Sequence, residues 1–186
     1  TYSLNASSMD ESVVVELLLN KNDLDFPDVA VVVTDVENLK RNLLLFTQIK
    51  DLEIPTVLVI NMSDQMRRKG IKIDLEKLEE QLQTRVILMS TRQKTGIDQL
   101  KQVLVAYRKL NTTPLFDPTT IDESYFASLQ KAFPNQSLYK LWLVITQDVN
   151  FTKLERQKVA DSSEFKTQSK SYLKKLQQRE TIKRYQ

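Results

Sequence analysis

The feature that most constrains the fold is the recurrence of short, continuous apolar runs along the first half of the chain. They read V-A-V-V-V (29–33), V-L-V-I (57–60) and V-I-L-M (86–89). Runs of this length that are rich in β-branched residues and lack polar alternation are typical of strands buried on both faces. The sequence therefore predicts three central strands of a covered sheet.

Helical periodicity fills the gaps around these runs. Residues 37–52, 74–83 and 96–109 each carry apolar side chains at steps of three and four, which favours amphipathic helices. Asp74 stands where it can cap the second of them. Strands that alternate with helices indicate parallel βαβ units, so we expect an α/β fold with an open sheet and helices on its faces.

The pattern changes near residue 111. The stretch N-T-T-P-L-F-D-P-T-T (111–120) has the prolines and threonines of a linker. Beyond it we expect only helices, over 121–132, 137–148, 152–160 and 164–185. Trp142 lies on an apolar stripe and is expected in their core. The sequence thus predicts two domains, residues 1–110 and 111–186.

Composition excludes several kinds of site. The chain has no histidine and no cysteine, which rules out Ser-His and Cys-His nucleophile pairs, disulfides and thiolate metal sites. No apolar run approaches the roughly 18 residues of a membrane-spanning helix. The net charge of +3 is unevenly spread: residues 1–110 carry −1, and residues 111–186 carry +4 from 12 basic and 8 acidic side chains. We interpret this surplus as a solvated helical face and expect no nucleic-acid partner.

Polar residues follow each predicted strand. Thr34 and Asp35 follow the first, the tetrapeptide N-M-S-D (61–64) follows the second, and S-T-R (90–92) follows the third. The carboxyl ends of parallel strands meet at one edge of the sheet, where open α/β sheets bind their ligands. We therefore expect these residues to surround a binding site.

The stretch formed by Asn61, Met62, Ser63 and Asp64 fits a guanine base. The Asp64 carboxylate can accept hydrogens from both N1 and the 2-amino group, whereas adenine would leave it facing an acceptor. Asn61 can donate to N7. Met62 replaces the lysine that most GTPases have here, and its unbranched apolar stem can still cover the base.

Ser90, Thr91 and Arg92 complete the same predicted pocket from the next strand. A backbone N–H in this stretch can reach guanine O6, and the Ser90 hydroxyl can brace the Asp64 carboxylate. N-x-x-D alone is a weak signal, because it occurs by chance in many proteins. Its combination with S-T-R, whose serine lies 26 residues beyond Asp64, is much more specific.

Glycine is scarce. The chain has two, Gly70 and Gly96, where average usage of roughly 7% would give about thirteen. Loops that cradle phosphate need glycine, because the backbone must approach the ligand closely. Neither G-x-x-x-x-G-K-[ST] nor G-x-G-x-x-G occurs in the sequence, so no phosphate-binding loop is assigned.

Several stretches together resemble the cytosolic G domain of FeoB, the bacterial ferrous iron transport protein B. N-M-S-D (61–64) and S-T-R-Q-K-T-G-I-D-Q-L (90–100) are similar to that family's fourth and fifth GTPase motifs. V-T-D-V-E-N-L-K-R-N-L (33–43) resembles its V-D-x-x-N-L-x-R-N-L. R-E-T-I-K-R-Y (179–185) resembles the end of its helical domain.

The resemblance implies a P-loop-GTPase-like open sheet with flanking helices, followed by a small all-α regulatory domain. T-Y-S-L (1–4) resembles the residues directly after the family's D-L-P-G motif. The P-loop, switch I and D-x-x-G would then precede this sequence, together with the contacts to phosphate, Mg²⁺ and K⁺. No catalytic residue and no metal ligand is therefore assigned in this chain.

The resemblance also implies ligands, partners and location. The ligand would be GTP or GDP, and the partner would be the polypeptide's own transmembrane domain, with a homo-oligomer as an option. The parent protein would lie in the bacterial inner membrane with this part on the cytoplasmic side, and the fragment itself would be soluble.

Three functions stay open at this point. In the first, the parent hydrolyses GTP to regulate Fe²⁺ uptake, and this chain reads the base. In the second, the chain is a non-catalytic helical interaction module that does not bind nucleotide. The third, nucleic-acid binding by the basic helices, lacks an aromatic platform. On these residues alone we expect weak or no nucleotide binding, because phosphate and metal contacts carry much of the affinity for GTP.

Overall fold

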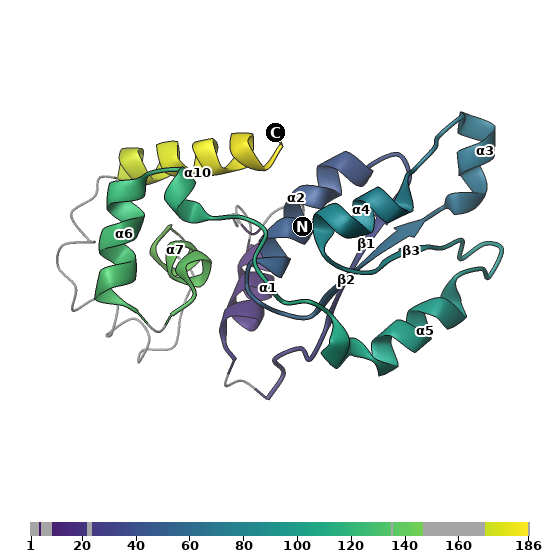
Figure 1. The fold of residues 1–186 in the computed structure, drawn as a ribbon, viewed down its shortest axis with the longest axis horizontal. Helices are drawn as coiled ribbons and strands as arrows, with labels where there is room; N and C mark the ends of the chain where they lie inside the picture. Colours follow the sequence, from purple (N-terminus) through teal and green to yellow (C-terminus); the bar gives the residue numbers. More distant parts are fainter. Residues whose placement is uncertain (1–3, 5–8, 22–23, 135, 147–169, 186) are drawn as a thin grey trace. The chain divides into compact units, whose positions relative to one another are not determined.

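The computed structural model describes residues 4, 9–21, 24–134, 136–146 and 170–185, and these form two compact units (Figure 1). Pro27–Leu115 form the sheet unit, and the described residues of Leu4–Phe26 and Phe116–Gln186 form the helical unit. The first helix, α1 (Met9–Leu19), therefore groups with the C-terminal helices. The assignment of residues 1–110 and 111–186 as functional domains stays a prediction.

A parallel sheet forms the centre of the first unit. Its strands are β1 (Ala30–Asp35), β2 (Thr56–Asn61) and β3 (Val86–Leu88), in the order β1-β2-β3. Both pairings are parallel, so the predicted βαβ arrangement is confirmed. β2 lies in the middle, and its first five residues are buried, as its continuous apolar sequence requires.

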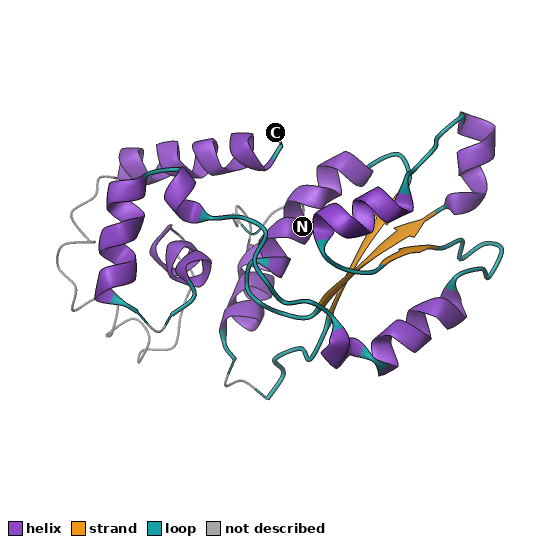
Figure 2. Cartoon of the chain, viewed as in Figure 1, coloured by secondary structure: helices purple, strands orange, loops and turns teal. Residues whose placement is uncertain are grey.

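Helices cover both faces of this sheet (Figure 2). α2 (Leu39–Lys50) and α4 (Leu75–Leu82) lie on one face, and α5 (Ile97–Val105) lies on the other. The α5 face contains one apolar cluster, formed by Val57, Val59, Ile87, Leu100, Val103 and Leu104. The helix predicted over 96–109 is shorter than expected, because residues 107–109 form a separate 3-10 turn after Ala106 leaves helical geometry.

Two aspartates cap the N-termini of helices. Asp74 accepts a hydrogen bond from the Lys77 backbone N–H at 3.1 Å and caps α4, as predicted. Asp122 accepts from the Tyr125 backbone N–H at 3.0 Å and from the Tyr172 hydroxyl at 2.6 Å. The hydrogen bond from the Tyr172 hydroxyl and that from the Tyr125 backbone N–H lower the pKa of Asp122. α6 (Glu123–Ala132) therefore begins at this cap, two residues later than the predicted start.

The helical unit contains a buried polar cluster that the sequence pattern did not indicate. Trp142 on α7 (Leu138–Thr146) is fully buried, as predicted. Its indole N–H donates to the carboxylate of Glu180 on α10 (Lys170–Arg184) at 3.1 Å. The same carboxylate, also fully buried, accepts from the Tyr139 hydroxyl and from Arg184 Nε, both at 2.9 Å. These donors satisfy a charge that would otherwise be costly to bury.

Two predictions for this unit reach beyond the described residues. The helix predicted over 152–160 lies outside them, and so does the first part of the helix predicted over 164–185. The described part of the latter is α10.

Residues 111–115 are attached to the end of α2. Lys50 Nζ donates to the Asn111 carbonyl at 2.5 Å, and the Leu115 backbone N–H donates to Asp51 Oδ1 at 2.7 Å. Lys50 is fully buried, and this burial lowers its pKa. The predicted linker is thus fixed along its first half, which explains why the sheet unit extends to Leu115.

The two glycines offer a matched test of the loop that follows β3. Gly96 has φ +82°, and an added Cβ would lie 2.4 Å from the Leu88 carbonyl oxygen. Gly70 has φ +66° with nothing within 4 Å of an added Cβ. Gly70→Ala should lower the free energy of unfolding by about 1 kcal/mol, the usual cost of left-handed backbone. Gly96→Ala should lower it by about 3 kcal/mol, because overpacking adds to that cost.

Urea unfolding followed by amide NMR of the sheet residues measures both values. Equal losses for the two variants would show that contact with Leu88 does not hold the loop close to β3.

Candidate functional site

The loops that follow β2 and β3 are joined at the carboxyl edge of the sheet. Met89 donates its backbone N–H to the Ile60 carbonyl at 2.8 Å, and Ser63 donates its own to the Met89 carbonyl at 3.0 Å. These bonds continue the parallel pairing one step beyond the strands. They bring the N-M-S-D turn and the S-T-R loop side by side, as the parallel arrangement predicts.

The turn after β2 depends on an unusual backbone conformation at Met62. Its φ of 62° and ψ of 29° are left-handed, a conformation that a residue with a side chain seldom adopts. Residues 63–65 then form one 3-10 turn, and Gln65 donates its backbone N–H to the Met62 carbonyl at 2.9 Å. The sharp reversal brings Asp64 back towards the strand that ends at Asn61.

Asn61 holds the backbone of the neighbouring loop. Its Oδ1 accepts from the Thr91 backbone N–H at 3.1 Å, and its Nδ2 donates to Thr91 Oγ1 at 3.4 Å. The pair of bonds fixes the plane of the amide, and it links two positions that lie 30 residues apart. Asn61 therefore ties the two loops together.

Asp64 is braced by Ser90. The Ser90 hydroxyl donates to Asp64 Oδ1 at 2.6 Å and accepts from the Gln93 backbone N–H at 3.2 Å. Ser90 is fully buried, whereas Asp64 is partly exposed. A charge-assisted bond of this length fixes the carboxylate while leaving it partly accessible to solvent.

The loop after β3 closes on itself. Ser90 and Thr95 pair through reciprocal backbone hydrogen bonds of 3.2 and 3.1 Å. Gly96 follows in left-handed geometry and passes close to the Leu88 carbonyl. The closure fixes the backbone around Thr91, whose N–H already bonds Asn61.

The remaining predicted residues are less constrained. Met62 has 42% of its surface exposed, and Ser63 contributes its backbone N–H to the junction of the loops. Arg92 is exposed within the closed loop. In the part of the chain that the structure describes, no hydrogen bond joins Arg92 to the other six residues.

The polar residues after β1 organise the chain locally. Asp35 Oδ1 accepts from the backbone N–H groups of Glu37 and Asn38 at 2.9 and 2.8 Å. The Asn38 side-chain amide donates to the same carboxylate, and these bonds lower the pKa of Asp35. The Thr34 hydroxyl accepts from Asn42 Nδ2 at 2.9 Å. Both side chains therefore shape the start of α2.

Some residues of the site were not predicted. Gln93 supplies a backbone N–H to Ser90, and Gln65 donates from Nε2 to Met62 Sδ at 3.6 Å. The three-residue spacing of Met62 and Gln65 gives no helical signal, because Met62 precedes the turn in left-handed geometry. Nothing in the sequence indicates the Gln93 contact.

Among the described residues, no group of three or more His, Cys, Asp or Glu side chains is placed to hold a metal ion. The geometry instead has one braced carboxylate and one fixed amide at the edge of a parallel sheet. Such an arrangement can read hydrogen-bond donors and acceptors on a planar ring.

The open parallel sheet, with its polar loops at the carboxyl edge, is a G-domain type of fold. Residues 1–104 match the family model described as ferrous iron transport protein B. This match covers more than half of the chain, and the chain therefore belongs to the FeoB family.

Individual relatives agree with this assignment. The Fe(2+) transporter FeoB of Leptospira biflexa is 32% identical over 134 residues, which are 70% of this chain and 19% of the transporter. That of Campylobacter jejuni is 34% identical over 105 residues, 56% of this chain and 16% of the transporter. The chain thus spans less than a fifth of the length of these relatives.

Solved structures show the same fold. The FeoB G domain of Methanococcus jannaschii has a TM-score of 0.54 and 34% identity, covering 59% of this chain and 67% of that one. The cytosolic domain of the T. maritima FeoB iron transporter, in its GMPPNP form, has a TM-score of 0.78 and 22% identity. That comparison covers 100% of this chain and 73% of the other.

The Ser90 hydroxyl provides the most direct test of this geometry. In Ser90→Ala, Gln93 loses its acceptor and Asp64 loses a charge-assisted donor inside the fold. The free energy of unfolding should fall by about 2 kcal/mol. Thr95→Ala, which removes an exposed hydroxyl from the same loop, should change it by less than about 0.5 kcal/mol.

Urea unfolding, monitored through amide resonances of β2 and β3, measures both variants. Similar unfolding midpoints and slopes for Ser90→Ala and the parent would contradict the role assigned to Ser90.

Proposed function

We propose that this chain carries the base-reading part of the GTP-binding and hydrolysing cytosolic domain of a FeoB-type ferrous iron transporter. The observation that carries the proposal is the 2.6 Å bond by which the buried Ser90 hydroxyl holds Asp64. It fixes a carboxylate at the same sheet edge as the Asn61 amide. Asn61, Met62, Ser63, Asp64, Ser90, Thr91 and Arg92 form the proposed nucleotide site.

Each side chain has a distinct part in this proposal. Asp64 accepts the N1 and 2-amino hydrogens of guanine, a pair that no other common purine offers. Asn61 donates to N7 from the amide that Thr91 already orients. A backbone N–H of the S-T-R loop meets O6. Adenine would place an acceptor, N1, against the carboxylate, and this mismatch is the source of selectivity.

Met62 and Arg92 flank this edge. The exposed Met62 stem supplies an apolar surface for the face of the base. Arg92, exposed in the closed loop, supplies a planar cation that can stack on the ring.

Phosphate and metal contacts are assigned to no residue of this chain. It lacks the glycine-rich sequences that cradle phosphate, and no suitable metal-binding group lies among its described residues. In the proposal, GTP or GDP binds with Mg²⁺, and with K⁺ where the family uses it, through residues outside this sequence. Binding by this chain alone is then weak, with a Kd on the order of 1 mM for a nucleoside monophosphate.

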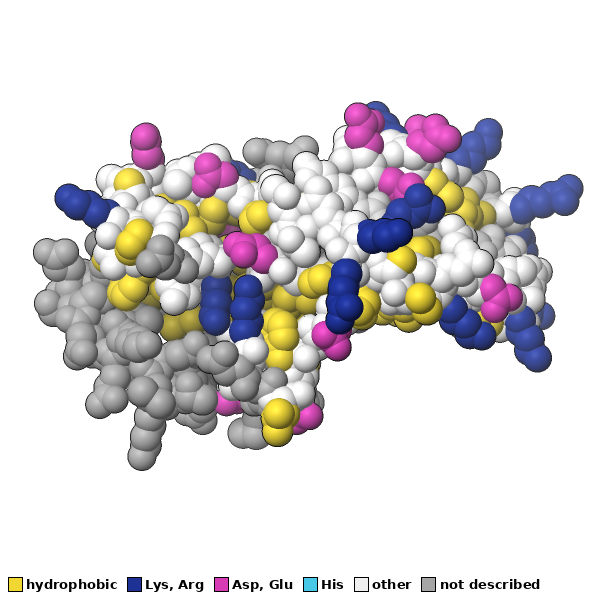
Figure 3. Space-filling view, turned by 60° about the horizontal axis from the view of Figure 1, so that its bottom comes forward, with side chains coloured by type: hydrophobic (Ala, Val, Ile, Leu, Met, Phe, Trp, Pro, Cys, Tyr) yellow, Lys and Arg dark blue, Asp and Glu magenta, His cyan; other side chains and the backbone are white. Residues whose placement is uncertain are grey.

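The proposed partners follow from the family. The helical unit regulates the sheet unit, and both act on a transmembrane part at the cytoplasmic face of a bacterial inner membrane. Among the described residues, no helix combines the length and apolar character needed to cross a bilayer. Figure 3 shows both basic and acidic side chains on the face that it draws.

Asp64→Asn tests the proposed base recognition. An asparagine amide can donate to the 2-carbonyl of xanthine and accept from N1–H, but it repels the 2-amino group of guanine. The variant should bind GMP about tenfold or more weakly than the parent and should gain affinity for XMP. Titration of ¹⁵N-labelled protein, followed by amide shifts in the two loops, measures both affinities.

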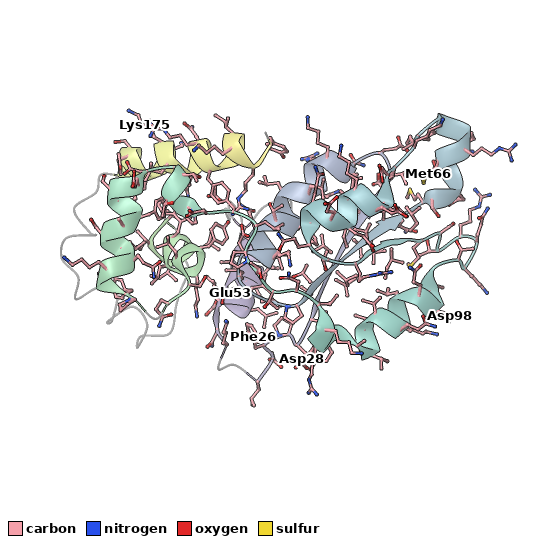
Figure 4. The ribbon with its side chains drawn as sticks, viewed as in Figure 1. Phe26, Asp28, Glu53, Met66, Asp98 and Lys175 are labelled. Atoms are coloured by element: carbon pink, nitrogen blue, oxygen red, sulfur yellow. The ribbon has the colours of Figure 1, made fainter. Side chains whose placement is uncertain are left out.

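Asp98→Asn is the matched control, because it makes the same charge change at an exposed position on α5 (labelled in Figure 4). It should bind GMP as the parent does. Unchanged GMP affinity in Asp64→Asn would overturn the proposed site. If the chain without substitutions folds cooperatively but shows no amide shift with GMP, the result would favour the helical interaction module instead.

A further inference from the structure

Met62 is connected to a short relay of side chains that starts on the next helical turn. Gln65 Nε2 donates to Met62 Sδ at 3.6 Å, a normal distance for a sulfur acceptor. Arg68 Nη2 donates to Gln65 Oε1 at 3.3 Å. Arg68 belongs to α3 (Met66–Lys69), whose first residue, Met66, is labelled in Figure 4.

Chemistry allows only one orientation of the Gln65 amide in this relay. A guanidinium can only donate, so the oxygen of the amide must face Arg68. A thioether can only accept, so the NH₂ group must face Met62. The two outer partners therefore fix the amide, and the positive charge of Arg68 polarises its N–H groups towards the sulfur.

The relay compensates for a weakness of methionine at this position. A methionine side chain has three rotatable bonds, and that of Met62 is 42% exposed, so solvent alone would leave it in many rotamers. Ordering such a chain on a ligand costs binding free energy. A donor held against the sulfur selects one arrangement before the ligand arrives.

We propose that Gln65 is a positioning residue that pre-orders the Met62 thioether as the platform for the face of the guanine ring. The inference rests on the proposed function, since it assumes that the base lies between Asn61 and Asp64. Other GTPases have a positively charged lysine at the position of Met62. In this arrangement Arg68 supplies the positive charge instead, and the Gln65 amide links it to Met62.

Methyl NMR provides the test, with the whole chain and GMP as the probe. The chain has four methionines, and the ¹³C-methyl signal of Met62 is assigned as the one lost in Met62→Leu. GMP should shift this signal upfield through the ring current of the stacked base, and AMP at equal concentration should not.

Two variants of Gln65 separate the relay from simple packing. Gln65→Glu keeps an acceptor for Arg68 but offers no hydrogen to the sulfur, and Gln65→Leu removes both bonds. Each should weaken GMP binding about threefold to tenfold and reduce the Met62 methyl shift at saturation. Gln102→Glu makes the same charge change at an exposed position of α5 and should alter neither value.

A double-mutant cycle completes the test. In a Met62→Leu background there is no sulfur to hold, so Gln65→Leu should cause no further loss of GMP affinity. Gln65 variants with the parent's affinity and the parent's Met62 shift would overturn the inference. If GMP binding still depends on Asp64 in that case, the base-reading site stands without the relay. If GMP shifts no loop resonance at all, both proposals fail.

Discussion

The structure of the candidate site depends on the hydrogen bond between Ser90 and Asp64. A carboxylate at the tip of a strand would ordinarily turn to solvent in several rotamers. Here a fully buried hydroxyl holds one of its oxygens at 2.6 Å and itself accepts a backbone N–H from Gln93. The acid is thus fixed from the protein side, and the bond joins loops that follow two different strands. Selectivity for a base needs this rigidity, because discrimination comes from acceptors that cannot adjust to the wrong donors.

The backbone of both loops adopts conformations that allow the hydrogen bond between Ser90 and Asp64 to form. Left-handed geometry at Met62 turns the chain back after β2, and the left-handed Gly96 lets the loop after β3 pass close to Leu88. Asn61 then fixes the Thr91 backbone through its side-chain oxygen. Strained or glycine-dependent conformations of this kind persist where the surrounding contacts determine them, and they cluster at functional sites.

The sequence predicted the sheet more completely than the site. Continuous apolar runs determine buried strands, and Asp74 is recognisable as a helix cap, so the α/β fold follows from local patterns. The closeness of Asp64 and Ser90 also follows, because parallel strands end at one edge. Contacts that depend on tertiary packing were not predictable. The Gln65 relay, the Glu180 cluster and the grouping of α1 with the helical unit each join residues whose types alone suggest solvent exposure or an undefined core.

The most direct measurement compares the affinities of the unmodified chain for GMP, IMP and AMP, with amide shifts at Asp64 and Ser90 as the readout. The phosphate and ribose are the same in all three, so differences report the base alone. GMP should bind tightest, IMP, which lacks the 2-amino group, should bind about tenfold more weakly, and AMP should cause no shift in these loops. Equal affinity for the three nucleotides would contradict a carboxylate that reads guanine.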